Sequence, residues 1–436
     1  MRALGASRTS LVPGGVLAGP WVRDDLWRRA RAVPSLDLRF ADNKSLVDAV
    51  TGASLVTFTR ASSGTFVDSA GVLQTAATNV PRFDHNPTTG ESLGLLVEEQ
   101  RTNLLLRSEE FDNASWGVLN VTVSANTQVA PNGTTSAETI TDVNGVTSAN
   151  VGCFQSIVLA DSTTYAMSCY VKAGTKTTCR VGIRDKAGTN ILANFNLTAV
   201  STTVGNAVSS TIQDAGNGWY RCTAICASLT GATSQRGLVF MDTGSYTADG
   251  TGTIHVWGAQ LEAGAFPTSY IPTTTAAVTR SADVASITGS AFTSFYNQSE
   301  GTIFVEGATS SSTANSILVA LDNGSSSERH RLLRIGATDS VQYSVTDAGS
   351  TQAAPGINSV FSGNTKAKLC GAYAINNFNL GFNGTLATPD TSGTLPTVDE
   401  MSIGAHLSGS YLNGHIRRLT YWPTRLADST LQQLTQ

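Results

Sequence analysis

The chain is poor in charged residues, which make up 14% of its 436 residues, against about 25% in typical globular domains. Glu, Lys and Arg, the good exposed helix formers, are therefore scarce. Thr and Val, which fit a pleated surface, are common. This composition argues against a protein built from exposed amphipathic helices. It predicts an all-β fold.

The chain also lacks long apolar runs. Nothing in it approaches the roughly 20 apolar residues of a membrane span, and its first residues contain no continuous apolar core of a signal peptide. The net charge of −4 gives no field that would attract nucleic acid or an anionic membrane. We therefore expect a protein made in a cytoplasm, or assembled there into something larger, with no nucleic-acid partner and no membrane insertion.

Cysteine is scarce as well, with six residues in the whole chain. We expect them to be buried small apolar residues. The spacing of Cys222 and Cys226 is a weak metal signal, because no further ligands are evident. A cross-strand pair of Cys169 and Cys179 stays open as an alternative, and in a reducing compartment it would remain unpaired.

The motifs of common enzymes are missing: there is no H-E-x-x-H, no phosphate-binding loop and no G-x-S-x-G elbow. A glycosidase needs two carboxylates about 5 to 10 Å apart across a sugar. Glu98 and Glu99 are neighbours on one predicted strand, so their side chains point to opposite faces. Glu109 and Glu110 are interpreted as a solvated turn. The sequence therefore predicts a protein that is not an enzyme.

Carboxylates in the loops of the middle region give a weak candidate for structural calcium, formed by Asp242, Asp249 and Glu262. Oxygen ligands of this kind suit Ca²⁺. The ordered Asp ladder of a dedicated calcium loop is missing, however. We therefore expect no cofactor and no dedicated metal site.

What the chain does contain is a succession of short alternating segments separated by Gly, Asn and Asp. In residues 165–172, Tyr165, Met167, Cys169 and Val171 fall on one face, the two-residue period of a half-buried strand. Many such strands without helical segments between them predict β-sandwiches. We expect two jelly-roll domains in tandem, at 111–275 and 276–436, after an extended arm over 1–35 and a linker of short strands over 36–110.

The arm differs from the rest of the chain. Residues 1–31 contain six arginines, against Asp24 and Asp25, and they include Trp21 and Trp27. Because buried Trp and Arg side chains are typical anchors of tight interfaces, we expect the arm to become ordered only by docking against a partner. The anchors that we assign to this docking are Trp21, Trp27, Arg28 and Arg29.

Sugar binding by a β-sandwich needs an aromatic platform and a few polar groups. The candidates are Tyr246, Trp257 and Tyr270 at the end of the middle domain, and Arg329, His330 and Arg331 in the last domain. Each has an alternative interpretation as a core or interface residue. Trp116, Trp219 and Trp422 are expected to be core residues, because each opens or closes an apolar strand.

Several long segments resemble known families. Residues 35–43, 56–116 and 258–283 resemble modules of tailed-bacteriophage structural proteins, found in fibres and other virion appendages. Residues 401–434 are similar to the last strands of concanavalin-like or laminin-G-like jelly rolls, and the middle domain resembles carbohydrate-binding modules.

The resemblance implies a virion component, a fibre or spike, that docks through its arm and presents β-sandwiches to a host glycan. Its partners would be portal, neck, tail or capsid proteins and further copies of itself, with a trimer expected from the family alone. It would be assembled in the host cytoplasm. The alternatives are a purely architectural decoration protein of the head or neck and a polysaccharide depolymerase.

Overall fold

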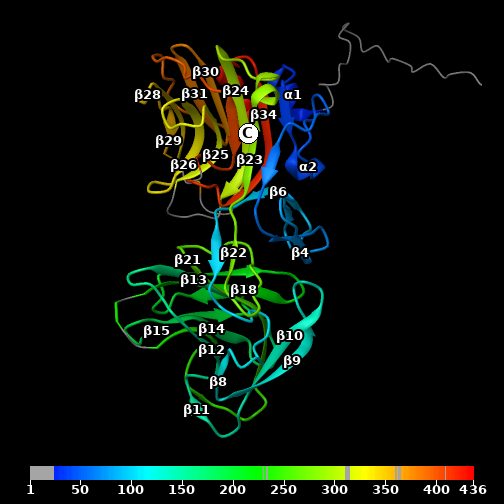
Figure 1. The fold of residues 1–436 in the computed structure, drawn as a ribbon, viewed down its shortest axis with the longest axis vertical. Helices are drawn as coiled ribbons and strands as arrows, with labels where there is room; N and C mark the ends of the chain where they lie inside the picture. The colour runs from blue at the N-terminus through cyan, green and yellow to red at the C-terminus, as the bar shows by residue number, and fades with distance from the viewer. Residues whose placement is uncertain are drawn as a thin grey trace, which may run out of the picture.

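The computed structural model describes residues 24–228, 230–231, 234–309, 315–358, 361, 365–407 and 409–436. Two β-sandwiches lie end to end, and a pair of strands that crosses between them, β7 (Arg101–Asn103) and β22 (Val278–Arg280), joins them (Figure 1). The described chain is all-β, which confirms the fold class and the tandem arrangement predicted from the sequence.

The middle sandwich has two antiparallel sheets, each of six strands within the described residues. The first sheet follows the order β17 (Ser209–Asp214), β18 (Trp219–Ala227), β13 (Thr164–Ala173), β21 (Thr253–Ala263), β10 (Thr135–Asp142), β9 (Val121–Val129). The second follows the order β16 (Ser201–Thr203), β15 (Asn190–Asn196), β14 (Thr178–Arg184), β19 (Gln235–Met241), β12 (Gly152–Ile157), β8 (Gly117–Leu119).

Alternation builds the core between these two sheets. Met167, Cys169 and Val171 of β13 meet Val181 and Ile183 of β14 in one buried cluster, as the two-residue period predicts. The residues between them in the sequence point to the outer faces. Each sheet of the middle sandwich therefore has an outer face, which other parts of the chain either cover or leave accessible.

The C-terminal sandwich also has two sheets, each of eight strands in the described part of the chain. The first contains β32 (Thr385–Leu386), β31 (Asn377–Phe382), β30 (Ala367–Ala374), β24 (Glu300–Thr309), β34 (Gly414–Trp422), β6 (Ser92–Val97), β5 (Phe83–His85) and, beside β34, β1 (Leu36–Leu38). The second contains β2 (Thr57–Thr59), β23 (Val284–Thr288), β33 (Glu400–Ile403), β25 (Ser316–Asp322), β26 (Arg329–Ile335), β27 (Ser340–Asp347), β28 (Ser350–Ala353) and, beside β27, β29 (Gly356–Ile357).

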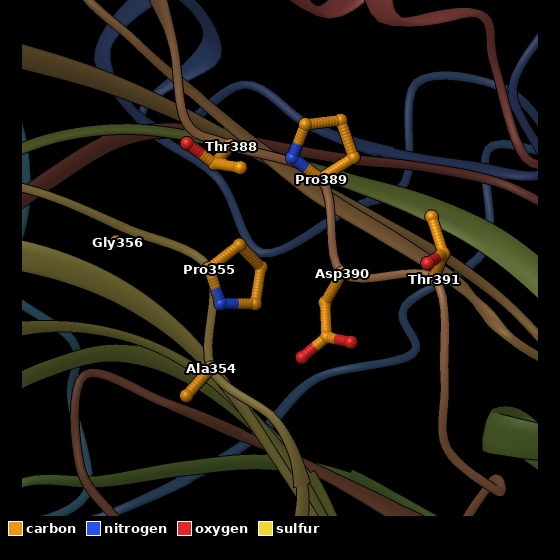
Figure 2. A pocket seen from close by; sticks show the side chains of 7 residues that line it. All are labelled: Ala354, Pro355, Gly356, Thr388, Pro389, Asp390 and Thr391. Carbon is orange, nitrogen blue, oxygen red and sulfur yellow. The ribbon is translucent and has the colours of Figure 1, made fainter.

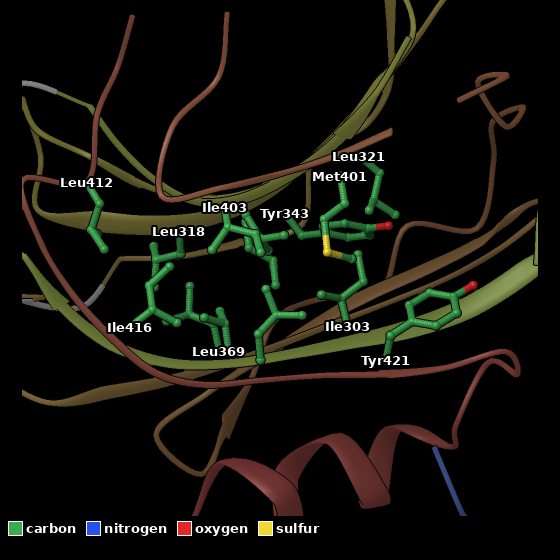
Figure 3. Close-up of a cluster of buried hydrophobic side chains, with 14 of the residues drawn as sticks. Ile303, Leu318, Leu321, Tyr343, Leu369, Met401, Ile403, Leu412, Ile416 and Tyr421 are labelled. Atoms are coloured by element: carbon green, nitrogen blue, oxygen red, sulfur yellow. The ribbon is translucent and has the colours of Figure 1, made fainter. Parts of the chain in front are cut away.

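Buried side chains of both sheets meet in the space between them (Figure 3). Leu321 of β25 and Met401 of β33 point into this core with Ile303 of β24 and Tyr421 of β34. Because alternate side chains of a strand point to opposite faces, the neighbours of Leu321 and Met401 lie on the outer face of the second sheet.

Residues 36–97, within the expected linker of short strands, are built into the C-terminal sandwich. Strands β1, β5 and β6 join its first sheet and β2 joins its second, so this sandwich is closed by chain from both sides of the middle domain. Two further small sheets are β3 (Gly64–Val67) with β4 (Leu73–Ala76), and β11 (Thr147–Ser148) with β20 (Tyr246–Thr247). The sequence did not reveal that residues 36–97 belong to the C-terminal sandwich, because β1, β2 and β6 pair with strands that follow the middle domain in the chain.

A buried charge network holds the junction of the two sandwiches. Asp283 accepts from Arg60 at 3.1 Å and from Arg82, and all three side chains are inaccessible to solvent. Arg82 also pairs with Glu98 at 2.8 Å, and Glu98 accepts from the backbone and the hydroxyl of Ser269 at 2.7 Å each. Glu98 is therefore a structural residue of the junction.

The described part of the expected arm is folded against the body. The helices are α1 (Asp25–Ala30), α2 (Phe40–Asn43), α3 (Gly289–Thr293) and α4 (Asp428–Thr435). Trp27 of α1 is 6% exposed, packs with Phe304 and Trp422, and donates to Asp37 at 3.0 Å. This corrects the prediction that Trp27 anchors the chain to another particle, because its ring is buried in the chain's own hydrophobic core.

The other predicted docking residues divide into two groups. Arg28 and Arg29 lie on the solvent side of α1, where both pair with Asp25, and Arg29 also reaches the Gln433 carbonyl at 3.1 Å. Trp21 lies outside the described residues. Arg28, whose side chain is 62% exposed, is thus the predicted anchor that remains open to a partner.

All six cysteines are free and buried, as expected for small apolar residues. Cys169 pairs in register with Cys222, whose Sγ lies 4.0 Å from that of Cys179. Burial raises the pKa of Cys226 to about 12, so this thiol stays protonated at neutral pH. Among the described residues, no helix has the length and apolar character needed to cross a membrane.

Candidate functional site

The second sheet of the C-terminal sandwich carries charged side chains on its outer face. In β26, His330 and Leu332 are fully buried, and His330 donates or accepts at 2.8 Å with Tyr343, a core residue. Arg329 and Arg331 occupy the alternate positions and are half-buried on the opposite face. The two arginines therefore lie on one face, two residues apart along one strand.

Strand register places these arginines in two rows of cross-strand neighbours. The first row is Glu400, Asp322, Arg329, Thr346, and the second is Ser402, Ala320, Arg331, Ser344. Directly opposed residues of antiparallel strands share a face and lie about 5 Å apart. We name the surface formed by these eight residues the Arg329–Arg331 face.

The two arginines of this face are poorly satisfied. Neither forms an ion pair with the described residues, and the Nε atoms of both lack a hydrogen-bond partner there. The one hydrogen bond of Arg331 within that part of the chain is a 3.5 Å contact with the Ser344 hydroxyl. Burial and the neighbouring Arg329 lower the pKa of Arg331 to about 10, so both remain charged at neutral pH. Their donors are available to an anion.

A carboxyl pair lies beside the arginines. Asp322 is completely buried, and burial together with the adjacent carboxyl of Glu400 raises the pKa of Asp322 to about 7. Its Oδ2 atom has no hydrogen-bond partner among the described residues and lies 3.8 Å from Nε2 of His406. Near pH 7 the carboxyl of Asp322 therefore changes between its neutral and its charged form.

His406 covers the same end of the face from the loop that follows β33. It is 6% exposed, and its Nε2 has no partner in the described part of the chain. Burial and repulsion by Arg329 and Arg331 lower the pKa of His406 to about 4. The ring is consequently neutral above about pH 5 and can give or take a hydrogen bond according to its tautomer.

The aromatic platform predicted in the middle sandwich is not exposed. Trp257 is 1% and Tyr270 is 2% exposed, and their ring centroids lie 4.8 Å apart in a cluster with Tyr170 and Trp219. Tyr170 and Trp257 alternate with core residues of β13 and β21, so the cluster lies on the outer face of the first sheet. This sheet is the one nearer the C-terminal sandwich (Figure 1). Leu73 of the β3–β4 hairpin packs against it. The assignment of Trp257 and Tyr270 to sugar binding is therefore wrong, because the junction covers both rings.

Two further predicted residues are also engaged elsewhere. His330 faces the core, where burial lowers its pKa to about 3, so it is wrong as a ligand residue. The ring of Tyr246 is half-buried, with Lys176 Nζ 3.9 Å from its centroid, and its hydroxyl bonds Asp142 at 3.2 Å. Tyr246 thus offers a sugar no free ring face on the side that Lys176 covers.

The weak calcium candidates do not converge. Asp242 bonds Thr178, Asp249 bonds Thr251, and Glu262 is completely buried against Thr268. Asp249 precedes the first residue of β21, Thr253, and Glu262 lies near the other end of this strand, about 30 Å from Thr253 at the rise of a strand. In the described ranges, no group of three or more His, Cys, Asp or Glu side chains is arranged to hold a metal ion.

The carboxylate pairs considered as catalytic groups serve structural roles. Glu98 belongs to the junction, and Glu99 pairs with Arg101 and with Asn413 at 3.1 Å. Glu109 receives a hydrogen bond from Tyr270 at 3.2 Å, and burial raises its pKa. Glu110 pairs with Arg107 at 3.1 Å.

An open pocket of about 370 Å³ lies elsewhere on the C-terminal sandwich, lined by residues 354–356 and 388–391 (Figure 2). Its one ionisable side chain is Asp390, whose carboxylate faces the same space as the ring of Pro355 (Figure 2). Asp390 already accepts from the backbone and hydroxyl of Ser392 at 3.2 and 3.3 Å. This pocket offers few directed polar groups compared with the Arg329–Arg331 face.

Sequence reasoning found the arginines of this face but missed Asp322, Glu400 and His406. Asp322 and Glu400 are 78 positions apart in the chain and become neighbours through the pairing of β25 with β33. Asp322 is the last residue of β25, whereas Glu400 is the first residue of β33 and directly follows Asp399, so no local motif joins the two. The available signal was an acidic residue at the end of one predicted strand and another at the start of a second strand. Recognising them as neighbours requires knowledge of the strand order.

No protein-family model and no curated protein matches the chain. Among solved structures, a carbohydrate-binding module of Ruminococcus gnavus IT-sialidase, bound to alpha2,3 sialyllactose, is similar at 18% identity over 32% of this chain and 84% of that chain, with a TM-score of 0.28. NanB sialidase from Streptococcus pneumoniae is similar at 13% over 34% and 26%, with a TM-score of 0.30. A SAP-like pentraxin from Limulus polyphemus is similar at 8% over 31% and 70%, with a TM-score of 0.25. These partial similarities carry no argument about function. The proposal below is based on the residues of this chain.

Proposed function

We propose that this chain is an adhesion protein that binds an anionic glycan through the Arg329–Arg331 face. One observation carries the proposal: two adjacent arginines share a face without any ion pair to the described residues. An unpaired, half-buried guanidinium is costly for the free protein. A carboxylate or sulfate group of a saccharide would supply the missing acceptors in the planar geometry that Arg prefers.

The remaining groups of the face suit the hydroxyls of a sugar. The hydroxyl groups beside the arginines, in the two rows set by the strand register, are those of the half-buried Ser402 and of Ser344 and Thr346, which are 5% and 4% exposed. Hydroxyls both donate and accept, so they accommodate either orientation of a sugar hydroxyl. The arginines would thus supply affinity for the charge, and the hydroxyls would supply orientation.

The binding test uses defined probes on the full chain: polygalacturonate for carboxylate, dextran sulfate for sulfate and unmodified dextran as the neutral control. We expect one charged probe or both to bind, and R329Q/R331Q to weaken binding by about 30-fold, the loss of two charge-assisted contacts at roughly 1 kcal/mol each. The matched control R28Q/R31Q removes the same charge from two exposed residues, one in α1 and one directly after it, and should leave binding unchanged. Equal weakening by both variants would contradict the proposal.

A more specific part of the proposal is that the protein is a fibre or spike component of a tailed-bacteriophage virion, in contact with portal, neck, tail or capsid proteins and with copies of itself. Its support is the sequence resemblance of residues 35–43, 56–116 and 258–283. Because α1 belongs to the folded body, the docking test is deletion of residues 1–23 and not 1–34. We expect a folded protein that no longer joins the particle, and normal incorporation would contradict docking through this segment.

A second candidate function is polysaccharide cleavage, and the Asp322–Glu400 pair is the observation that favours it. A carboxyl group with a pKa of about 7 can act as a general acid near neutral pH. Release of new reducing ends from host polysaccharide, lost in E400Q, would establish a depolymerase. Binding without new ends supports adhesion, and the absence of both binding and cleavage supports a purely architectural protein.

A further inference from the structure

The middle sandwich has a second arginine surface, on the outer face of its second sheet. Core residues alternate with outward residues along β14 and β19, so every second side chain points away from the core. The cross-strand register arranges the outward residues in three rows. The rows are Ser156, Arg236, Arg184, Asn190; then Phe154, Leu238, Gly182, Leu192; then Gly152, Phe240, Arg180, Asn194.

Two of these arginines are direct neighbours that lack acidic partners. Arg184 and Arg236 are opposed across β14 and β19, and both are half-buried. The Nε atoms of both lack a hydrogen-bond partner, and neither side chain forms an ion pair with the described residues. Like charges directly opposed across strands repel each other. An anion between them would remove this repulsion.

Two arginines of this surface, Arg236 and Arg180, are held in place by aromatic rings, and Arg180 also by backbone carbonyls. The guanidinium of Arg236 lies 4.0 Å from the ring centroid of Phe154, and that of Arg180 lies 5.5 Å from the centroid of Phe240. Arg180 also donates from Nε to the Asp242 carbonyl at 2.9 Å, and it donates to the Ala149 carbonyl. Stacked guanidinium groups are pre-organised, so less side-chain entropy is lost on binding.

Within the described residues, no helix or further sheet packs over the apolar residues of this face. Leu192, Leu238 and Phe240 form a buried cluster with Leu119 and Phe154, and all five side chains belong to strands of the same sheet. The elements that contact β14 and β19 most extensively are strands of their own sheet and of the opposite sheet. The sheet lies on the side of the middle sandwich away from the C-terminal sandwich (Figure 1). The junction that covers the aromatic cluster therefore leaves this face open.

We infer that this surface, the Arg184–Arg236 face, is a separate binding site for a carboxylate-bearing or sulfate-bearing saccharide. Arg184 and Arg236 would clamp the anionic group, and the side-chain amides of Asn190 and Asn194 would bond sugar hydroxyls. The choice of a saccharide rests on the proposed adhesion function, whereas the charge of the ligand follows from the arginines alone. A second site on the connected sandwich would add avidity for a polymer that reaches both faces.

The experiment uses the full chain with polygalacturonate, dextran sulfate and neutral dextran, measured by isothermal titration calorimetry at two salt concentrations. We expect charged probe to bind at two classes of site. R184Q/R236Q should remove one class with at least a 10-fold loss of affinity there, while R329Q/R331Q leaves that class intact. Polygalacturonate binding alone would identify carboxylate as the ligand group, and dextran sulfate binding alone would identify sulfate.

Several outcomes would overturn the inference. One is a single class of sites that R184Q/R236Q leaves unchanged. Another is an equal loss of affinity in the exposed-charge control R28Q/R31Q. A third is double-stranded DNA that competes as well as the saccharides, since that would indicate non-specific anion binding. R184K/R236K keeps the charge without the forked donors, so it should recover only part of the affinity that R184Q/R236Q loses. Full recovery would show that binding needs the charge alone and no forked hydrogen bonds from guanidinium groups. The thermal midpoint of each variant checks that the fold is retained.

Discussion

The two sandwiches use their outer faces in different ways. In the middle sandwich, the aromatic face with Trp257 and Tyr270 is covered by the junction, and the opposite face carries the half-buried Arg184 and Arg236. In the C-terminal sandwich, the half-buried arginine pair lies beside the carboxyls of Asp322 and Glu400. Both domains thus present arginines that form no ion pair with the described residues, and the C-terminal pair lies beside Asp322, whose pKa is raised to about 7.

The difference teaches which side chains mark a ligand site in this molecule. Large aromatic rings bury much apolar area, so they are favoured in the buried contact between the two domains. Arginines without acceptors cannot be satisfied by such packing, and they stay at the surface. Unpaired charge, more than aromatic content, therefore distinguishes the candidate sites here.

The largest effect is expected from breaking the junction that creates this division of faces. D283A would leave the guanidinium groups of Arg60 and Arg82 buried without their shared carboxylate. Removing one partner of a buried ion pair costs about 4 kcal/mol. Urea unfolding of D283A should show this loss, whereas D25A, which breaks exposed pairs on α1, should cost less than about 1 kcal/mol. A loss as small as that of D25A would show that the junction does not depend on Asp283.

The next test separates core from binding site in the middle sandwich. W257A removes a ring that contacts Tyr170 and Tyr270 and whose Nε1 donates to Ser136 at 3.2 Å. The free energy of unfolding should fall by about 3 kcal/mol because of the cavity, while affinity for dextran sulfate or polygalacturonate stays unchanged. W257F should recover part of the stability. Unchanged stability together with lost binding would restore the sugar-platform interpretation.

The fold could be predicted largely from alternation, because a period of two residues is visible within each strand. The same rule places Arg329 and Arg331 on one face, and it also places His330 on the other. Grouping all three as ligand residues was therefore an error that the sequence itself could have corrected. The burial of Trp257 and Tyr270 could not be deduced in this way, because Leu73 of the β3–β4 hairpin, about 190 positions earlier in the chain, packs against their cluster.

The last test uses Asp322, the titrating neighbour of the C-terminal arginine pair. The pKa of Asp322 is raised from 3.8 to about 7, so the native state binds one proton more than the unfolded state between these values. Stability should therefore decrease as pH rises through this window, and D322N should remove that decrease. Glu400 and Arg329 face the same carboxyl across the two adjoining strands, and His406 faces it from its loop.

The same titration should tune binding at this face. Below about pH 7 the protonated Asp322 no longer opposes an anion beside Arg329 and Arg331, so we expect affinity for dextran sulfate to increase about threefold to tenfold between pH 8 and pH 6. His406, with a pKa of about 4, stays neutral throughout this range and adds nothing to the change. In D322N the affinity should be high at both pH values. The Arg184–Arg236 face, measured in R329Q/R331Q, should show no such dependence. A pH dependence that persists in D322N would assign the titration to another group and would remove the distinction between the two arginine faces.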